Sequence, residues 1–74
     1  MDTSAQMAIE AVLVGLAEAK VLSFDQLAVV LRSIEDAGAS AGHNVPAVEE
    51  DLDVLVRNVR HLTGCYPGRQ PPQT

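Results

Sequence analysis

The chain has 74 residues, of which 47% are hydrophobic, and its formal net charge is −5. This apolar content excludes a disordered chain, and the length allows one small domain at most. The acidic balance disfavours direct nucleic-acid binding, and no apolar run has the length of a membrane span. One cysteine excludes an internal disulfide. Together with an N-terminal segment that lacks the positive charges of a signal peptide, it indicates a cytoplasmic protein.

The first predicted helix covers residues 4–21, with Thr3 or Ser4 as its N-cap. One of its faces is apolar and consists of Ile9, Val12, Leu13 and Leu16. A second apolar stripe lies on nearly the opposite side and consists of Met7, Val14 and Val21, with Ala11 close by. We interpret this second stripe as the interface for a homodimer or a docked protein. The alternative is that its members lie at the edge of an ordinary bundle.

The second predicted helix covers residues 24–37 and begins with a capping box. In such a box the Ser23 hydroxyl accepts a hydrogen bond from the Gln26 amide, and the Gln26 side chain accepts one from the Ser23 amide. The short connection before it predicts an antiparallel hairpin with the first helix. Gly38 is expected to end the second helix, and a loop with two glycines is expected over residues 38–44.

The third predicted helix covers residues 46–63, with Pro46 in its first turn and Gly64 as its stop. It carries apolar residues at spacings of four, three, four and three: Val48, Leu52, Leu55, Val59 and Leu62. The stripe covers little more than two heptads, whereas a sustained coiled coil has at least three or four. We therefore expect it to close a core within the chain.

Together these patterns predict an all-α fold, a three-helix bundle built from a helical hairpin and a longer third helix. The bundle would form a single domain of residues 1–64, followed by a Pro-rich tail of residues 65–74. Dimerisation through the first helix is expected if its second stripe is an interface. The predicted core consists of Ile9, Val12, Leu13, Leu16, Leu27, Val30, Leu31, Ile34, Val48, Leu52, Leu55, Val59 and Leu62.

No catalytic, metal-binding or cofactor-binding pattern stands out, and we expect no enzyme activity and no small-molecule ligand. His61 precedes Cys65 by four residues, but Gly64 interrupts the helix between them, so an activated thiol is not expected. The acidic run of residues 49–53 lacks the glycine and the ligand spacing of a calcium loop. A weak basic patch consists of Arg57, Arg60, His61 and Arg69. It is a secondary candidate surface for an acidic partner or a nucleic-acid backbone, and the alternative is compensation of the helix dipole.

The functional hypothesis is a small protein–protein interaction module, such as an adaptor, a chaperone-like subunit, a docking module or an assembly factor. Its partner would cover the second stripe of the first helix, at Met7, Ala11, Val14 and Val21. The alternative is a small acidic inhibitor or regulator, of the phage or plasmid kind, that binds a basic surface of a nucleic-acid-handling machine. The dependence of affinity on ionic strength distinguishes the two hypotheses. A complex held together by charges weakens steeply as ionic strength rises, whereas a complex with an apolar interface does not.

Overall fold

A computed structural model describes residues 1–67, which form α1 (Thr3–Glu18), α2 (Phe24–Gly42) and α3 (Pro46–Thr63). These residues contain no strand, so the predicted all-α three-helix bundle is confirmed. Within the described range, no helix combines the length and the apolar character needed to cross a membrane. Most of the predicted tail, including Arg69, lies outside the described residues.

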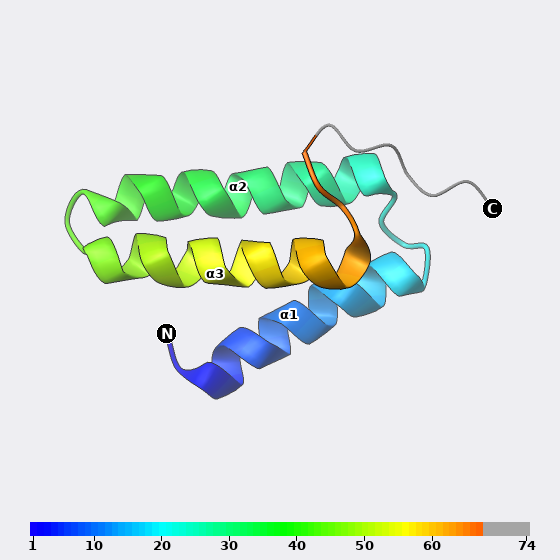
Figure 1. Cartoon of the computed structure of the whole chain (residues 1–74), viewed down its shortest axis with the longest axis horizontal. Coiled ribbons are helices and arrows are strands. Elements are labelled where there is room, and N and C mark those ends of the chain that lie inside the picture. The colour runs from blue at the N-terminus through cyan, green and yellow to red at the C-terminus, as the bar shows by residue number, and fades with distance from the viewer. Residues whose placement is uncertain (68–74) are drawn as a thin grey trace.

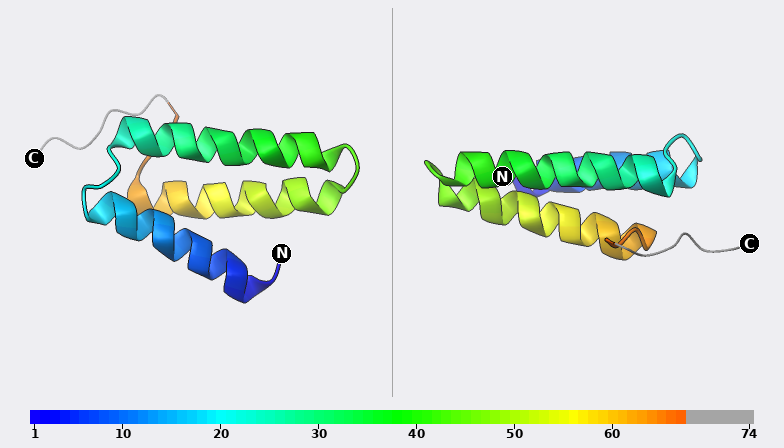
Figure 2. Two further views of the ribbon diagram at one scale, coloured as in Figure 1. Left: turned by 180° about the vertical axis from the view of Figure 1, so that it is seen from behind. Right: turned by 90° about the horizontal axis from the view of Figure 1, so that it is seen from above.

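The helices α2 and α3 lie side by side and antiparallel, whereas α1 lies against α3 and diverges from α2 toward the N-terminus (Figures 1 and 2). The close helical pair is therefore α2 with α3, and not α1 with α2 as the short connection between them suggested. A short connection makes two helices neighbours in the chain, but the apolar faces decide which pair packs along its full length.

The N-cap of α1 is Asp2, whose side chain accepts a hydrogen bond from the Ser4 amide at 3.3 Å. Neither Thr3 nor Ser4 is therefore the N-cap. The helix ends at Glu18 instead of residue 21, in a turn where the Val21 amide donates to the Leu16 carbonyl at 3.0 Å. This turn places Lys20 at φ 63°, in the left-handed region that glycine normally occupies.

The capping box of α2 is confirmed, because the Gln26 amide donates to Ser23 Oγ at 3.1 Å and the Ser23 amide donates to Gln26 Oε1 at 2.9 Å. The prediction that Gly38 ends the helix is wrong, since α2 continues to Gly42. Gly38 is buried, and a Cβ atom placed on it would lie 3.2 Å from Leu52 Cβ. The glycine therefore permits close packing of α2 on α3, and the contact keeps the segment helical.

The boundaries of α3 agree with the sequence prediction. Pro46 occupies its first turn, and Gly64 ends it at φ 74°, where its amide donates to the Arg60 carbonyl at 2.8 Å. Because α2 continues past Gly38, it has 19 residues and α3 has 18, so the third helix is not the longest.

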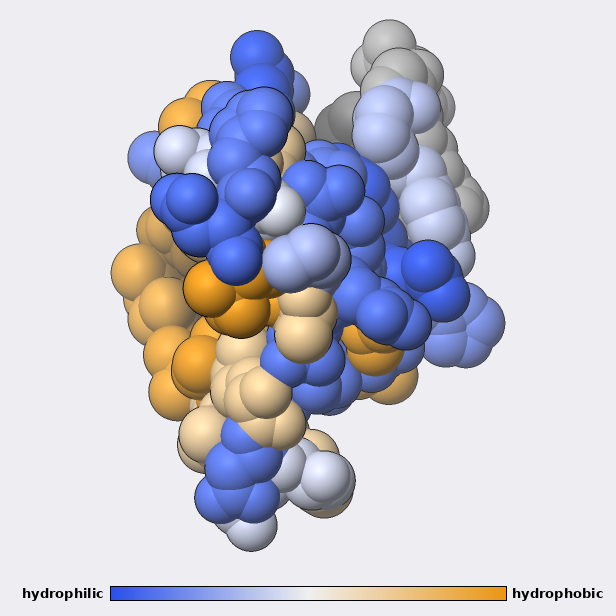
Figure 3. Space-filling view, turned by 90° about the vertical axis from the view of Figure 1, so that its left-hand side faces the viewer, coloured by the Kyte–Doolittle hydropathy of each residue, from blue (hydrophilic) through white to orange (hydrophobic). Residues whose placement is uncertain are grey.

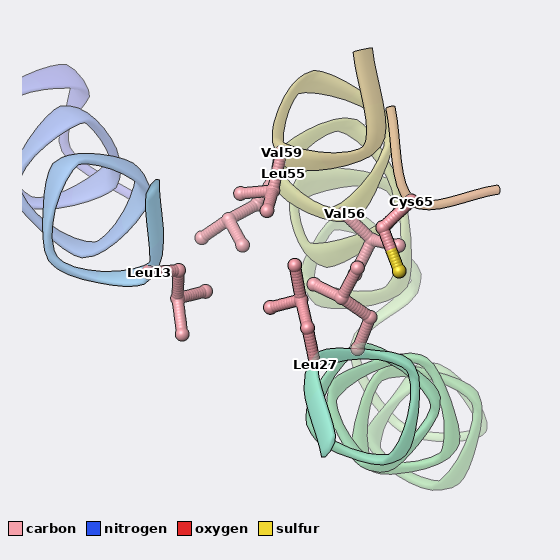
Figure 4. Packing of buried hydrophobic residues seen from close by; sticks show 7 residues of the cluster. Leu13, Leu27, Leu55, Val56, Val59 and Cys65 are labelled. Carbon is pink, nitrogen blue, oxygen red and sulfur yellow. The ribbon is translucent and has the colours of Figure 1, made fainter. Parts of the chain in front are cut away.

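The core lies mainly between α2 and α3, and α1 contributes one buried side chain, Leu13 (Figure 4). Three predicted core residues are instead on the surface: Ile9 is 41% exposed, Val12 60% and Leu62 61%. Two members of the buried hydrophobic cluster were not predicted, Val56 and Cys65. The complete buried cluster is Leu13, Leu27, Leu31, Leu55, Val56, Val59 and Cys65, and the half-buried predicted members are Leu16, Val30, Ile34, Val48 and Leu52.

Two of the helical glycines, Gly38 and Gly15, should respond in opposite directions to a larger side chain. Gly38→Val should lower the free energy of unfolding by about 1–3 kcal/mol, because the added carbons press on Leu52. Gly15→Ala is the matched control; a Cβ there meets nothing within 4 Å, so stability should rise by about 1 kcal/mol through helix propensity. Urea unfolding followed by circular dichroism measures both changes. A stabilised Gly38→Val protein would contradict the close contact.

Replacing Lys20 by glycine should raise the free energy of unfolding by about 1 kcal/mol, because glycine adopts positive φ without steric cost. Ala19→Gly is the control; Ala19 has φ −76°, so glycine there relieves no strain and should be destabilising. Thermal unfolding of the two variants gives the comparison. If both substitutions lower stability equally, the left-handed turn does not form in solution.

Candidate interaction surface

The orientation of α1 differs from the one that its apolar stripes suggest. Its contact with the rest of the chain is made by Leu13, which is buried at the edge of the first stripe, and by the sector between the two stripes, where Ala17 is half-buried. At 100° per residue, Ile9 and Val12 then lie on one side of the contact, and Met7 lies on the other. Both stripes are therefore largely left on the surface.

Polar contacts hold α1 in this orientation. Asn58 of α3 donates through Nδ2 to Glu10 Oε2 at 2.9 Å, and Gln6 donates to the same oxygen at 3.0 Å. The N-terminal amine of Met1 contacts Asp51 of α3. Glu10, the one charged residue between Thr3 and Ala17, is half-buried, and its Oε2 atom is occupied by bonds within the chain.

The outward side of α1 is consequently uncharged over three turns. Its exposed members between residues 5 and 15 are Ala5, Met7, Ala8, Ile9, Ala11, Val12 and Gly15. Most surface helices have the opposite arrangement, with charged residues outside and apolar residues inside. Figure 3 looks at the molecule from its left-hand side in Figure 1 and shows hydrophobic residues gathered on one flank, while much of the other is hydrophilic.

A shallow groove of about 360 Å³ lies between α1 and the C-terminal end of α3. Its floor and walls are mostly apolar, and its lining among residues 1–67 includes two carboxylates, those of Glu10 and Glu18, and no basic side chain. The lining residues are Met7, Glu10, Ala11, Val14, Gly15, Glu18 and Leu62. We call this feature the α1–α3 groove.

The structure brings three of the four candidate interface residues together in this groove: Met7, Ala11 and Val14. The fourth, Val21, is exposed in the turn after α1 and does not line it. Sequence reasoning missed Leu62, which it assigned to the core because Leu62 continues the heptad stripe of α3. Leu62 lies in the last turn of α3, where it is 61% exposed and lines the groove beside α1.

The described residues of the basic patch do not form one continuous basic surface. Arg60 makes two hydrogen bonds to the Glu35 carboxylate, at 2.6 and 3.2 Å, which ties α3 to α2. Arg57 and Arg60 line one hollow, together with Glu35 and Asp53, so their surroundings have mixed charge. His61 is exposed on α3 and does not line this hollow.

The chemical environment of Cys65 differs from that of a reactive thiol. Its side chain is buried, with Sγ 3.5 Å from the carbonyl oxygen of Phe24, whereas His61 is exposed. Burial raises the pKa of the Cys65 thiol; Arg60 opposes the rise and Asp25 adds to it. A nucleophilic cysteine instead has a lowered pKa and some exposure to solvent.

Comparison with family models, with curated proteins and with solved structures found no match to the chain. The assignment of function that follows depends on the surfaces of this chain alone.

The raised pKa of Cys65 should make stability depend on pH in the alkaline range. The folded state favours the protonated thiol, so this contribution is complete below the unfolded pKa of about 8.5 and is lost as pH rises toward the folded pKa. Urea unfolding between neutral and alkaline pH should show a decline in stability that Cys65→Ala reduces. An identical decline in the two proteins would contradict the burial of the thiol.

Proposed function

We propose that this chain is a small, non-catalytic protein–protein interaction module that binds its partner through the outward surface of α1. The observation that carries the proposal is the inverted polarity of this helix. Its mid-helix carboxylate, Glu10, bonds to Asn58 of the same chain, while Met7 and Val12 are exposed to solvent. Apolar patches of this kind often mark binding surfaces in soluble proteins.

The energetics agree with a role in binding. Burying a large aliphatic side chain contributes about 1.5–3 kcal/mol, and α1 leaves Met7, Ile9 and Val12 uncovered. A partner that covers these three side chains would gain a substantial part of the free energy that a micromolar complex needs, about 8 kcal/mol. Adaptor, docking, chaperone-like and assembly functions all use such a surface, and we propose a cytoplasmic location for it.

The second candidate is a small acidic inhibitor or regulator that covers a basic surface. The net charge of −5 supports it, as does the absence of any basic side chain from the α1–α3 groove. Such a complex would lose affinity steeply with added salt, whereas the apolar surface of α1 would give a weak dependence.

Site-specific photo-crosslinking in the cell that makes the protein tests the interaction surface. A photoreactive phenylalanine analogue at Met7 should give one discrete protein adduct. The matched control is the same analogue at Val29 of α2, since the two side chains are similarly exposed, at 63% and 58%. The Val29 position should give no adduct. Equal adducts from both positions, or none from Met7, would contradict a binding role for α1.

A further inference from the structure

The α1–α3 groove has the dimensions of a helix-binding site. Its lining on α1 extends from Met7 to Glu18, which at 1.5 Å per residue is about 17 Å, the length of three helical turns. Met7 and Leu62 are large and exposed, whereas Ala11 and Gly15 are small. The two small residues leave a low point in the floor, where a bulky side chain of a docked helix can insert as a knob into a hole.

The charges of the groove select the kind of helix. Glu18 makes no hydrogen bond or ion pair with the described residues, and Glu10 uses one of its oxygens for bonds within the chain. Eight residues separate these carboxylates, about 12 Å along the helix axis. Lysine or arginine side chains of an occupant would complement both.

The α1 helix of a second copy does not supply such charges. The α1 sequence, Thr3–Glu18, contains two charged residues, and both are glutamates. Docking of α1 from another copy would bring carboxylates toward carboxylates, between two chains that each carry a net charge of −5. Like charges across an interface are unfavourable, so the groove fits a basic helix of another protein better than it fits α1 of a second copy.

We propose that the α1–α3 groove binds an amphipathic helix of another protein, with apolar side chains on one face and lysine or arginine beside them. This inference rests on the proposed interaction function and specifies its partner. The apolar face would place residues at i, i+3 or i+4, and i+7 along the groove, the spacing of helices that dock in grooves. The basic flank would lie beside Glu18.

Binding of three labelled peptides to the purified chain, measured by fluorescence anisotropy, tests the proposal. The first is a designed three-turn helix with leucines on one face and lysines at the flanks. The second has the same leucines with glutamates at the flanks, and the third is the α1 sequence, Thr3–Glu18. The lysine peptide should bind at least tenfold more tightly than either of the others.

Two variants locate the binding site. Ala11→Gln fills the low point of the floor and should weaken binding of the lysine peptide at least tenfold. Ala39→Gln is its matched control, because Ala39 is an exposed helical alanine on α2 that does not line the groove, and it should bind as the wild type does. Glu18→Gln should weaken binding by up to about fivefold, as expected for one exposed ion pair. Circular dichroism should show all three variants to be folded.

Several results would overturn the inference: equal binding of the lysine and glutamate peptides, tightest binding of the α1 peptide, equal weakening by Ala11→Gln and Ala39→Gln, or no peptide binding at all. Tightest binding of the α1 peptide would identify a second copy as the occupant. If Met7 gives a crosslink in the cell and the lysine peptide does not bind, the interaction function stands and the helical partner is wrong. If Met7 gives no crosslink, the interaction function itself is contradicted.

Discussion

The packing of α2 against α3 is the constraint on which the rest of the structure depends. Leu27 and Leu31 of α2 are fully buried, as are Val56 and Val59 of α3, and Gly38 lets the two helices approach closely at Leu52. This contact occupies most of the apolar surface that α3 offers. The first helix packs at the edge of the core, where one leucine, Leu13, reaches the buried cluster (Figure 4).

The first helix has an exposed apolar surface because α2 occupies most of the apolar surface of α3. A helix with two apolar stripes would gain most from burial on both sides, but residues 1–67 contain no further helix that could cover it. It contacts α3 through the sector between the stripes, and the bonds from Asn58 and Gln6 to Glu10 satisfy the carboxylate that this sector contains. The interaction surface is therefore a consequence of how a small core is shared among three helices.

The sequence predicts what local chemistry determines and misses what depends on contacts between helices. The capping box at Ser23, the start at Pro46 and the stop at Gly64 each depend on a few neighbouring residues, and all three agree with the structure. Gly38 has the same local signature as Gly64, yet packing against Leu52 keeps it helical. Helical periodicity identified Met7, Ala11 and Val14 as one stripe, but the side of α1 that faces α3 depends on Asn58, 48 residues after Glu10.

Binding and the stability of α1 should be coupled, because the surface proposed for the partner belongs to the helix with the smallest share of the core. Segments with few buried apolar contacts open locally at low cost in free energy. A ligand that binds the closed form stabilises it by mass action, by about 2.7 kcal/mol at a hundredfold excess over its dissociation constant. A partner helix in the α1–α3 groove would touch both Met7 of α1 and Leu62 of α3. It would thereby bridge α1 and α3 with apolar contacts, which the packing of α2 against α3 does not provide.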